Sequence, residues 1–263
     1  MLYDDQAAGF DERAGVPADA VEAVAAALVE IVGPVEGQRW LEVGAGTGGL
    51  SLPLLRLPIR YTGFDQSPAM LEVFRERAAA AGLAADLHVA DGNGRWPAGD
   101  ASTDVVFSAR ALHHLDPEHA AAETRRVLRA PGGWLVLGRV RRPPDSPKSV
   151  LRRQMRRMLE AQGFAGRSHE ARAGAVFAAL ERASGQRMEP RVAAGWTGTH
   201  SPADSIASWE GKSGLAGIDV PADAKARVLS DLRAWAAAEY GDLHQLLEQE
   251  ESFELDAVRV PIG

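Results

Sequence analysis

The first 140 residues alternate compact apolar runs with segments in which apolar side chains recur at helical spacing. The compact runs have the length of buried strands and lie at residues 39–43, 59–64, 86–90, 103–108 and 134–140. Helical spacing precedes or separates them, at residues 17–32, 68–81 and 117–129. Strands that alternate with helices favour right-handed crossovers and a parallel sheet. The pattern predicts an α/β fold, a Rossmann-like three-layer α/β/α sandwich with a mostly parallel sheet.

The second half of the chain has a different pattern. Prolines punctuate residues 143–147 and mark a linker. Helical spacing then recurs at residues 148–163, 169–184, 202–212 and 222–240. Residues 253–260 have the pattern of a last strand, and Pro190 would confine a possible strand at 188–197 to an edge or an end. We therefore expect a mainly helical lid, inserted before the last strand or strands.

These patterns divide the chain into four parts. We expect an N-terminal cap helix region at 1–35, a Rossmann-like core at 36–140, a mainly helical substrate lid at 141–250, and a last strand returning to the core sheet at 251–263. The possible strand near 188–197 lies within the lid. The lid carries no assignable motif, and it is where we expect the choice of substrate to be made.

Composition narrows the classes of function. The chain has 263 residues and no cysteine, which excludes disulfides, thiolate-ligated zinc, iron–sulfur clusters and thiol nucleophiles. Lys and Arg number 29 against 36 Asp and Glu, and the resulting net charge of −7 argues against general nucleic-acid binding. No apolar run approaches the roughly 18 residues of a membrane span, and the acidic start lacks the apolar core of a secretory signal. We expect a cytoplasmic protein without an integral membrane segment.

A glycine-rich turn follows the first apolar run. It reads Gly44-Ala45-Gly46-Thr47-Gly48-Gly49 and leads into an expected helix over residues 50–55. Glycines allow a tight turn and let a ligand approach the backbone at the carboxyl end of a strand. The spacing fits both a Gly-x-Gly-x-Gly turn and the dinucleotide fingerprint, so taken alone it does not choose a cofactor.

Acidic residues mark the same end of three successive predicted strands. Asp65 closes the second strand and could accept hydrogen bonds from ribose hydroxyls, and Asp91-Gly92 closes the third. Glu42, just before the first glycine, is poorly placed beside a pyrophosphate but suits a cationic ligand. Each acid alone could be a turn residue or a helix cap. Together they indicate a ligand-binding edge, because carboxyl ends are where such sheets bind ligands.

The chain here resembles the class I S-adenosylmethionine-dependent methyltransferases, in the branch that contains quinone-biosynthesis C-methyltransferases and many small-molecule methyltransferases. The resemblance covers residues 36–138. It is carried by five segments in order: Leu41-Glu42-Val43-Gly44-Ala45-Gly46-Thr47-Gly48, Gly63-Phe64-Asp65-Gln66-Ser67-Pro68-Ala69-Met70-Leu71, Ala90-Asp91-Gly92, Ala111-Leu112-His113-His114-Leu115, and Arg126-Val127-Leu128-Arg129-Ala130-Pro131-Gly132-Gly133. One departure is Asn93-Gly94-Arg95-Trp96-Pro97, where the family usually carries a Leu-Pro pair and short acidic residues.

The resemblance implies S-adenosylmethionine as cofactor and a small molecule as methyl acceptor. The methionine part would lie against the turn formed by Glu42, Gly44, Ala45, Gly46, Thr47 and Gly48. The implied contacts of the remaining parts are Asp65 with the ribose, Gln66 or Met70 with the adenine, Asp91 with the adenine amino group, the Gly92 backbone with the ring, and Ser108 near the cofactor's amino group. The implied reaction is an in-line displacement of the methyl group from sulfur.

Two adjacent histidines are the candidates for catalysis. His114 and His113 follow the fourth predicted strand, and either could act as a general base or touch the substrate. The alternative is a hydrogen-bonded histidine that shapes the loop, since the pair occurs in family members of differing substrate. No His, Asp or Glu spacing predicts a metal site.

Other interpretations stay open. A nicotinamide-dependent oxidoreductase could use the turn at 44–49, although no Tyr has the Lys four residues on that short-chain members require. A non-catalytic S-adenosylmethionine-binding module is the third. The basic stretch 139–157 could be a solvated face, contact an anionic substrate, or give a peripheral membrane contact. The sequence leaves open whether O, N, C or S is methylated, and the oligomeric state.

Overall fold

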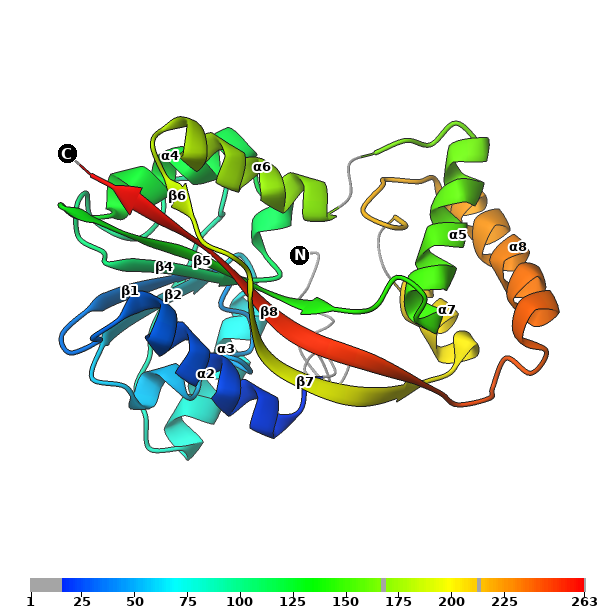
Figure 1. Ribbon diagram of the computed structural model, residues 1–263, viewed down its shortest axis with the longest axis horizontal. Helices are drawn as coiled ribbons and strands as arrows, with labels where there is room; N and C mark the ends of the chain where they lie inside the picture. The colour runs from blue at the N-terminus through cyan, green and yellow to red at the C-terminus, as the bar shows by residue number, and fades with distance from the viewer. Residues whose placement is uncertain (1–15, 167–168, 212–213, 263) are drawn as a thin grey trace. The chain divides into compact units, whose positions relative to one another are not determined.

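The computed structural model describes residues 16–166, 169–211 and 214–262 (Figure 1). Its helices are α2 Ala18–Val32, α3 Pro68–Ala80, α4 Pro117–Val127, α5 Pro147–Ala161, α6 His169–Arg182, α7 Pro202–Glu210 and α8 Ala222–Tyr240, with short 3₁₀ turns η2 Leu54–Arg56 and η3 Leu112–His114. Its strands are β1 Arg39–Val43, β2 Arg60–Asp65, β3 Asp86–Val89, β4 Val105–Ala109, β5 Gly132–Arg141, β6 Gln186–Arg187, β7 Arg191–His200 and β8 Leu247–Pro261. Residues 1–15, part of the predicted cap region, lie outside this description.

Within the described residues, the strands form one eight-stranded sheet in the order β3-β2-β1-β4-β5-β8-β6, with β7 also paired to β8. The pairs among β1 to β5 are parallel, whereas β6 runs antiparallel to β8. Helices α2 and α3 cover one face of this sheet, and α4 and α6 cover the other (Figure 1). The predicted Rossmann-like three-layer fold with a mostly parallel sheet is confirmed.

The chain divides into two compact units. Unit 1 contains the described residues up to Val140 together with Arg172–Ala194 and the chain from Phe253 onward. Unit 2 contains Arg141–Ala171 and Gly195–Ser252. The core of unit 1 packs α4 and α6 against the sheet, and that of unit 2 packs α5, α7 and α8 around Leu151, Met155 and Val228.

One helix departs from the predicted division of the chain. Residues 169–184 were expected in the lid, but Val176, Phe177 and Leu180 of α6 are buried in the core of unit 1. An apolar helical face packs wherever it finds a partner surface, and its sequence alone does not say which. The segment 141–250 therefore does not form a continuous lid.

The expected helix over residues 50–55 is wrong. The structure has turns there, followed only by the three residues of η2. Pro53 interrupts the segment, and a proline inside a helix removes a hydrogen bond and clashes with the preceding turn. The preceding Gly48 and Gly49 are poor helix formers as well.

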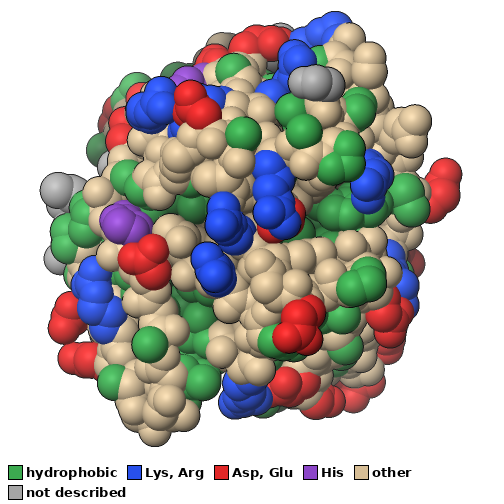
Figure 2. All heavy atoms as spheres, turned by 90° about the vertical axis from the view of Figure 1, so that its left-hand side faces the viewer, with side chains coloured by type: hydrophobic (Ala, Val, Ile, Leu, Met, Phe, Trp, Pro, Cys, Tyr) green, Lys and Arg blue, Asp and Glu red, His purple; other side chains and the backbone are tan. Residues whose placement is uncertain are grey.

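Figure 2 shows the side of the molecule that lies at the left of Figure 1. Acidic and basic side chains are interspersed there, with hydrophobic side chains between them. This mixture is typical of an ordinary solvated surface. In the part of the chain that the structure describes, no helix combines the length and apolarity needed to span a membrane.

Candidate functional site

The glycine turn begins where β1 ends. Gly44, Gly46 and Gly48 have φ angles of 75°, 54° and 74°, a region that favours glycine. A Cβ on Gly44 would lie 2.2 Å from the Ala111 Cβ, and one on Gly48 would lie 2.2 Å from the Phe74 ring. Of the residues that the structure describes, none lies within 4 Å of where a Cβ on Gly46 would be. Packing therefore requires the two outer glycines, whereas no described residue packs against the Cα of Gly46.

Asp65, the last residue of β2, holds this turn. One carboxylate oxygen accepts from the Gly46 amide at 3.0 Å, and the other accepts from the Ser67 amide at 3.0 Å. The carboxylate thus connects the glycine turn to the start of α3, where the Ser67 hydroxyl caps the Met70 amide. A carboxylate has about four lone-pair sites in total, so it can accept more than two hydrogen bonds. Gln66 is exposed beside it, and Met70 is buried.

Glu42 lies inside the protein, only 3% exposed. One of its carboxyl oxygens accepts from the Ser51 hydroxyl and from the Tyr61 hydroxyl, each at 2.5 Å. Burial raises the pKa of Glu42 from 4.5 to about 7, although the two hydroxyls oppose the rise. Glu42 is therefore only partly charged at neutral pH, which weakens the cation attraction expected of it.

The third strand end carries an exposed acid. Asp91 lies just beyond β3, and one of its carboxylate oxygens accepts from the Asn93 amide at 2.9 Å. A Cβ on Gly92 would lie 2.6 Å from the Leu115 side chain, so the packing of Leu115 favours glycine at this position. Because β2 and β3 pair in parallel with Asp65 opposite Val89, Asp91 follows the strand end adjacent to Asp65.

Ser108 lies beside the glycine turn. Its side chain is fully buried on β4, and its hydroxyl donates to the Val43 carbonyl at 2.8 Å. This bond ties β4 to the end of β1, next to the glycine turn. The predicted position of Ser108 near the cofactor's amino group stays a prediction.

The two candidate catalytic histidines lie in η3, after β4. Their ring centroids lie 4.0 Å apart, and the ring planes are tilted by 43° to each other. The pKa of His114 is lowered mainly because the ring is partly removed from water, and to a smaller extent by the positive charge of Arg172. A lowered pKa keeps the ring neutral at pH 7, the form that a general base requires.

Unit 2 holds a polar cluster that the sequence analysis missed. The Glu251 side chain is 1% exposed and accepts from Arg142 Nε at 2.6 Å and from Gln249 Nε2 at 2.5 Å. His200 Nε2 lies 3.1 Å from the same carboxylate. Arg142 and Glu251 are 109 residues apart, so no local pattern connects them. Among the described residues, no group of three or more potential ligands is arranged to hold a metal ion.

Comparison with known proteins finds a similar family for one part of the chain. A family model of the methyltransferase domain matches residues 41–137, which include the glycine turn, Asp65 and Asp91. This segment is thus similar to methyltransferase domains. It makes up the parallel part of the sheet, from β1 to β5.

Relatives of the methyltransferase domain are similar over this part of the chain. An uncharacterized methyltransferase of Mycobacterium tuberculosis is 40% identical over 104 residues, which are 40% of this chain and 40% of that protein. A ubiquinone biosynthesis O-methyltransferase of Cereibacter sphaeroides is 33% identical over 113 residues, 43% of this chain and 45% of that one. The chain thus matches less than half the length of these curated relatives.

Solved structures share the fold over a longer stretch. The YcgJ protein of Bacillus subtilis covers 91% of this chain and 98% of its own, with a TM-score of 0.57 and 18% identity. A geranyl diphosphate C-methyltransferase of Streptomyces coelicolor, solved with S-adenosyl-L-homocysteine, covers 90% of this chain and 78% of its own, with a TM-score of 0.51 and 14% identity. At these identities the likeness concerns the fold.

Proposed function

We propose that this chain is an S-adenosylmethionine-dependent methyltransferase that transfers a methyl group to a small-molecule acceptor. The observation that carries the proposal is the edge formed by three adjacent strand ends. There the backbone of Gly46, the carboxylate of Asp65 and the exposed carboxylate of Asp91 follow β1, β2 and β3 in the segment that matches the methyltransferase family model. Relatives that are named as methyltransferases support it.

The residues of this edge fit the parts of the cofactor. Among the described residues, the backbone at Gly46 leaves space that the methionine part could occupy. The Asp65 carboxylate, which already binds the turn, would accept from ribose hydroxyls. Asp91 would accept from the adenine amino group, and the Gly92 backbone would contact the ring. The bound cofactor supplies a methyl group already activated by its sulfonium centre. The protein then has to hold the acceptor in line with the methyl–sulfur bond and exclude water. Such positioning can lower the activation barrier by roughly 7–11 kcal/mol.

His114 is our candidate for the general base, with His113 beside it. The support is its position after β4 and the lowered pKa that keeps it neutral. A base is needed only where the acceptor keeps its proton at neutral pH. It would then increase the rate of methyl transfer about 10²- to 10⁴-fold. We further propose that unit 2 carries the residues that select the acceptor.

The remaining sequence expectations belong to the same proposal. They are a cytoplasmic location, no nucleic-acid partner, and at most a peripheral membrane contact through the basic stretch 139–157. The nicotinamide oxidoreductase is not favoured, because the glycine turn lies in the segment that matches the methyltransferase family model.

Calorimetric titration tests the proposed function. S-adenosylmethionine, S-adenosylhomocysteine and NADH would be titrated into the full chain, into Asp65→Ala and into Asp86→Ala. Asp86 is the control, since it is an acid at the opposite end of the neighbouring strand β3. We expect both sulfur compounds to bind wild type and Asp86→Ala, with at least tenfold weaker binding to Asp65→Ala. Binding of NADH alone would overturn the proposal.

A further inference from the structure

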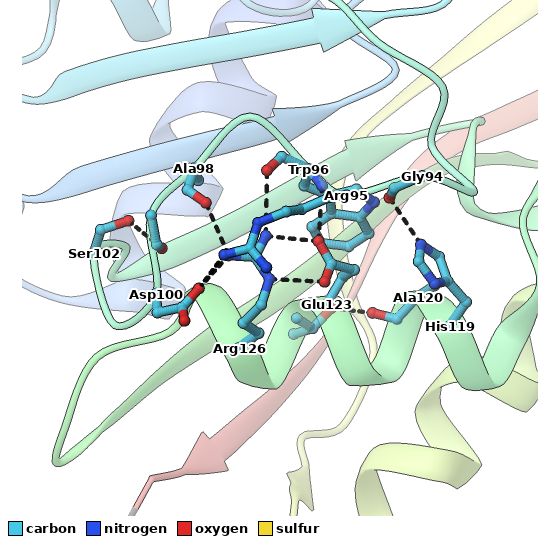
Figure 3. Close-up of polar contacts among 12 residues, drawn as sticks. Gly94, Arg95, Trp96, Ala98, Asp100, Ser102, His119, Ala120, Glu123 and Arg126 are labelled. Carbon is cyan, nitrogen blue, oxygen red and sulfur yellow. Dashed lines mark hydrogen bonds and ion pairs between the residues drawn. The ribbon is translucent and has the colours of Figure 1, made fainter.

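The loop between β3 and β4 carries Asp91 and Gly92. Side chains of helix α4 form hydrogen bonds with the backbone of this loop (Figure 3). Glu123 of α4 accepts from the Trp96 amide at 2.7 Å. Arg126, one turn further, donates to the carbonyls of Trp96 at 3.2 Å and of Ala98 at 2.9 Å. The loop backbone is thus bound through both donors and acceptors by two side chains of one helix.

The two side chains also hold each other. Arg126 donates to Glu123 through two nitrogens, at 2.7 Å and 2.6 Å, and to Asp100 at 2.7 Å (Figure 3). Arg126 is 16% exposed and Glu123 is buried. The guanidinium lowers the pKa of Glu123, and the carboxylates raise that of Arg126. Both groups are charged at neutral pH, and their planar geometry leaves little freedom to rotate.

Trp96 connects this pair to the proposed adenine end of the site. Its indole nitrogen donates to the Gly92 carbonyl at 2.9 Å. Its ring is 1% exposed and packs against Phe64, the residue before Asp65, with centroids 5.9 Å apart. A shift of Trp96 would therefore move Gly92 and disturb the strand end that carries Asp65.

The start of α4 holds the other side of the same loop. The Asp116 amide donates to the Asn93 side chain at 2.8 Å, and His119 Nε2 lies 2.9 Å from the Gly94 carbonyl (Figure 3). Residues 92–98 are consequently attached to α4 at several points. Exposed loops without such attachments are usually more mobile.

We propose that Glu123 and Arg126 are positioning residues that, through Trp96, fix Asp91 and Gly92 for binding the adenine part of the cofactor. This inference rests on the proposed function. Apart from the bonds between the two side chains, the hydrogen bonds found for them among the described residues go to Trp96, Ala98 and Asp100 of this loop, so we expect their effect to fall on the adenosine portion of a ligand. Loosening it would weaken the binding of adenosine and of S-adenosylhomocysteine by the same factor.

The experiment is calorimetric titration of the full chain with these two ligands, at a temperature where circular dichroism shows each variant folded. The variants are Glu123→Gln, Arg126→Lys and Trp96→Phe. The matched control is Arg129→Gln, which breaks the ion pair between Arg129 and Asp104 just beyond the C-terminal end of α4 and leaves the 92–98 loop contacts intact. Trp96→Phe leaves the ion pair in place and removes only the hydrogen bond from Trp96 to Gly92. It therefore tests the role of Trp96 even where Glu123→Gln does not fold.

We expect Glu123→Gln and Trp96→Phe to weaken both ligands about tenfold, the effect of one or two lost hydrogen bonds. Arg126→Lys keeps the positive charge but not the several N–H donors of the guanidinium. It should reduce the affinity for both ligands less than Glu123→Gln does. The control should stay within twofold of wild type. Unchanged affinity in Glu123→Gln or Trp96→Phe, or an equal loss in the control, would overturn the inference alone. A wild-type chain that binds neither ligand would overturn the proposed function as well.

Discussion

Two buried glutamates lie near opposite ends of the proposed cofactor edge, and their surroundings shift their pKa values in opposite directions. Glu42 near the glycine turn is surrounded by hydroxyls, and its pKa rises to about 7. Glu123 near the adenine loop has a guanidinium as its partner, and its pKa falls. Burial alone therefore does not decide the charge of an acid, because a neutral donor offsets less of the desolvation cost than a cation does. Glu42 near one end of the edge therefore changes its charge around neutral pH, whereas Glu123 near the other end is ionised there.

The largest effect should come from Arg126→Leu. The substitution leaves Glu123 buried without its cation, and removing one partner of a buried pair costs about 3 kcal/mol of unfolding free energy. Urea denaturation followed by circular dichroism measures the loss. Arg129→Leu breaks the more exposed pair with Asp104 and should cost about 1 kcal/mol. Equal costs for the two variants would contradict the comparison.

Glu42→Gln should stabilise the protein increasingly as pH rises. A folded pKa of about 7 against an unfolded 4.5 means that the folded state binds the proton more tightly. Wild type thus loses stability between pH 4.5 and pH 7, by about 3 kcal/mol at most, and Gln removes this loss. Both hydroxyls donate to one carboxyl oxygen, and the single carbonyl oxygen of Gln can accept both.

The measurement is urea denaturation of wild type and Glu42→Gln at pH 5, 6, 7 and 8. Glu123→Gln is the matched control, because the contribution of a lowered pKa is fully present above pH 4.5 and is lost only at more acid pH. Its difference from wild type should stay constant from pH 5 to pH 8. A pH-independent difference for Glu42→Gln would show that Glu42 is ionised throughout.

Tyr61→Phe should have the smallest effect of the three. It removes one donor to Glu42 and lowers the free energy of unfolding by about 1 kcal/mol at pH 5. The loss should grow toward pH 8, because the hydrogen bond is stronger to the charged form. Tyr240→Phe, on α8 in unit 2, serves as the control for loss of a phenol group. A loss that shrinks with rising pH would contradict the arrangement around Glu42.

Much of unit 1 could be predicted from the sequence because buried parallel strands leave apolar runs. Residues 39–43 coincide with β1, and the run at 59–64 is displaced by one residue from β2. The last strand was expected at 253–260, but β8 begins at Leu247. Its first half alternates the exposed acids Glu248 and Glu250 with the buried polar residues Gln249 and Glu251, so it lacks an apolar run.

The strand ends could also be predicted, since the acids follow consecutive strands of a parallel sheet. What could not be predicted was the direction of each side chain. Glu42 meets Tyr61 and Ser108 meets Val43 only after β1 has paired with β2 and β4. The pairing of Glu123 with Arg126 does have a local signal, because residues three apart share a helix face.

Amide hydrogen exchange with and without S-adenosylhomocysteine tests the central claim most directly. The claim is that the ligand binds along the ends of β1, β2 and β3. The account predicts slower exchange with ligand in three segments, residues 44–48, 65–70 and 91–94, and unchanged exchange in α8. Slowing confined to unit 2, or no slowing anywhere at saturating ligand, would contradict it.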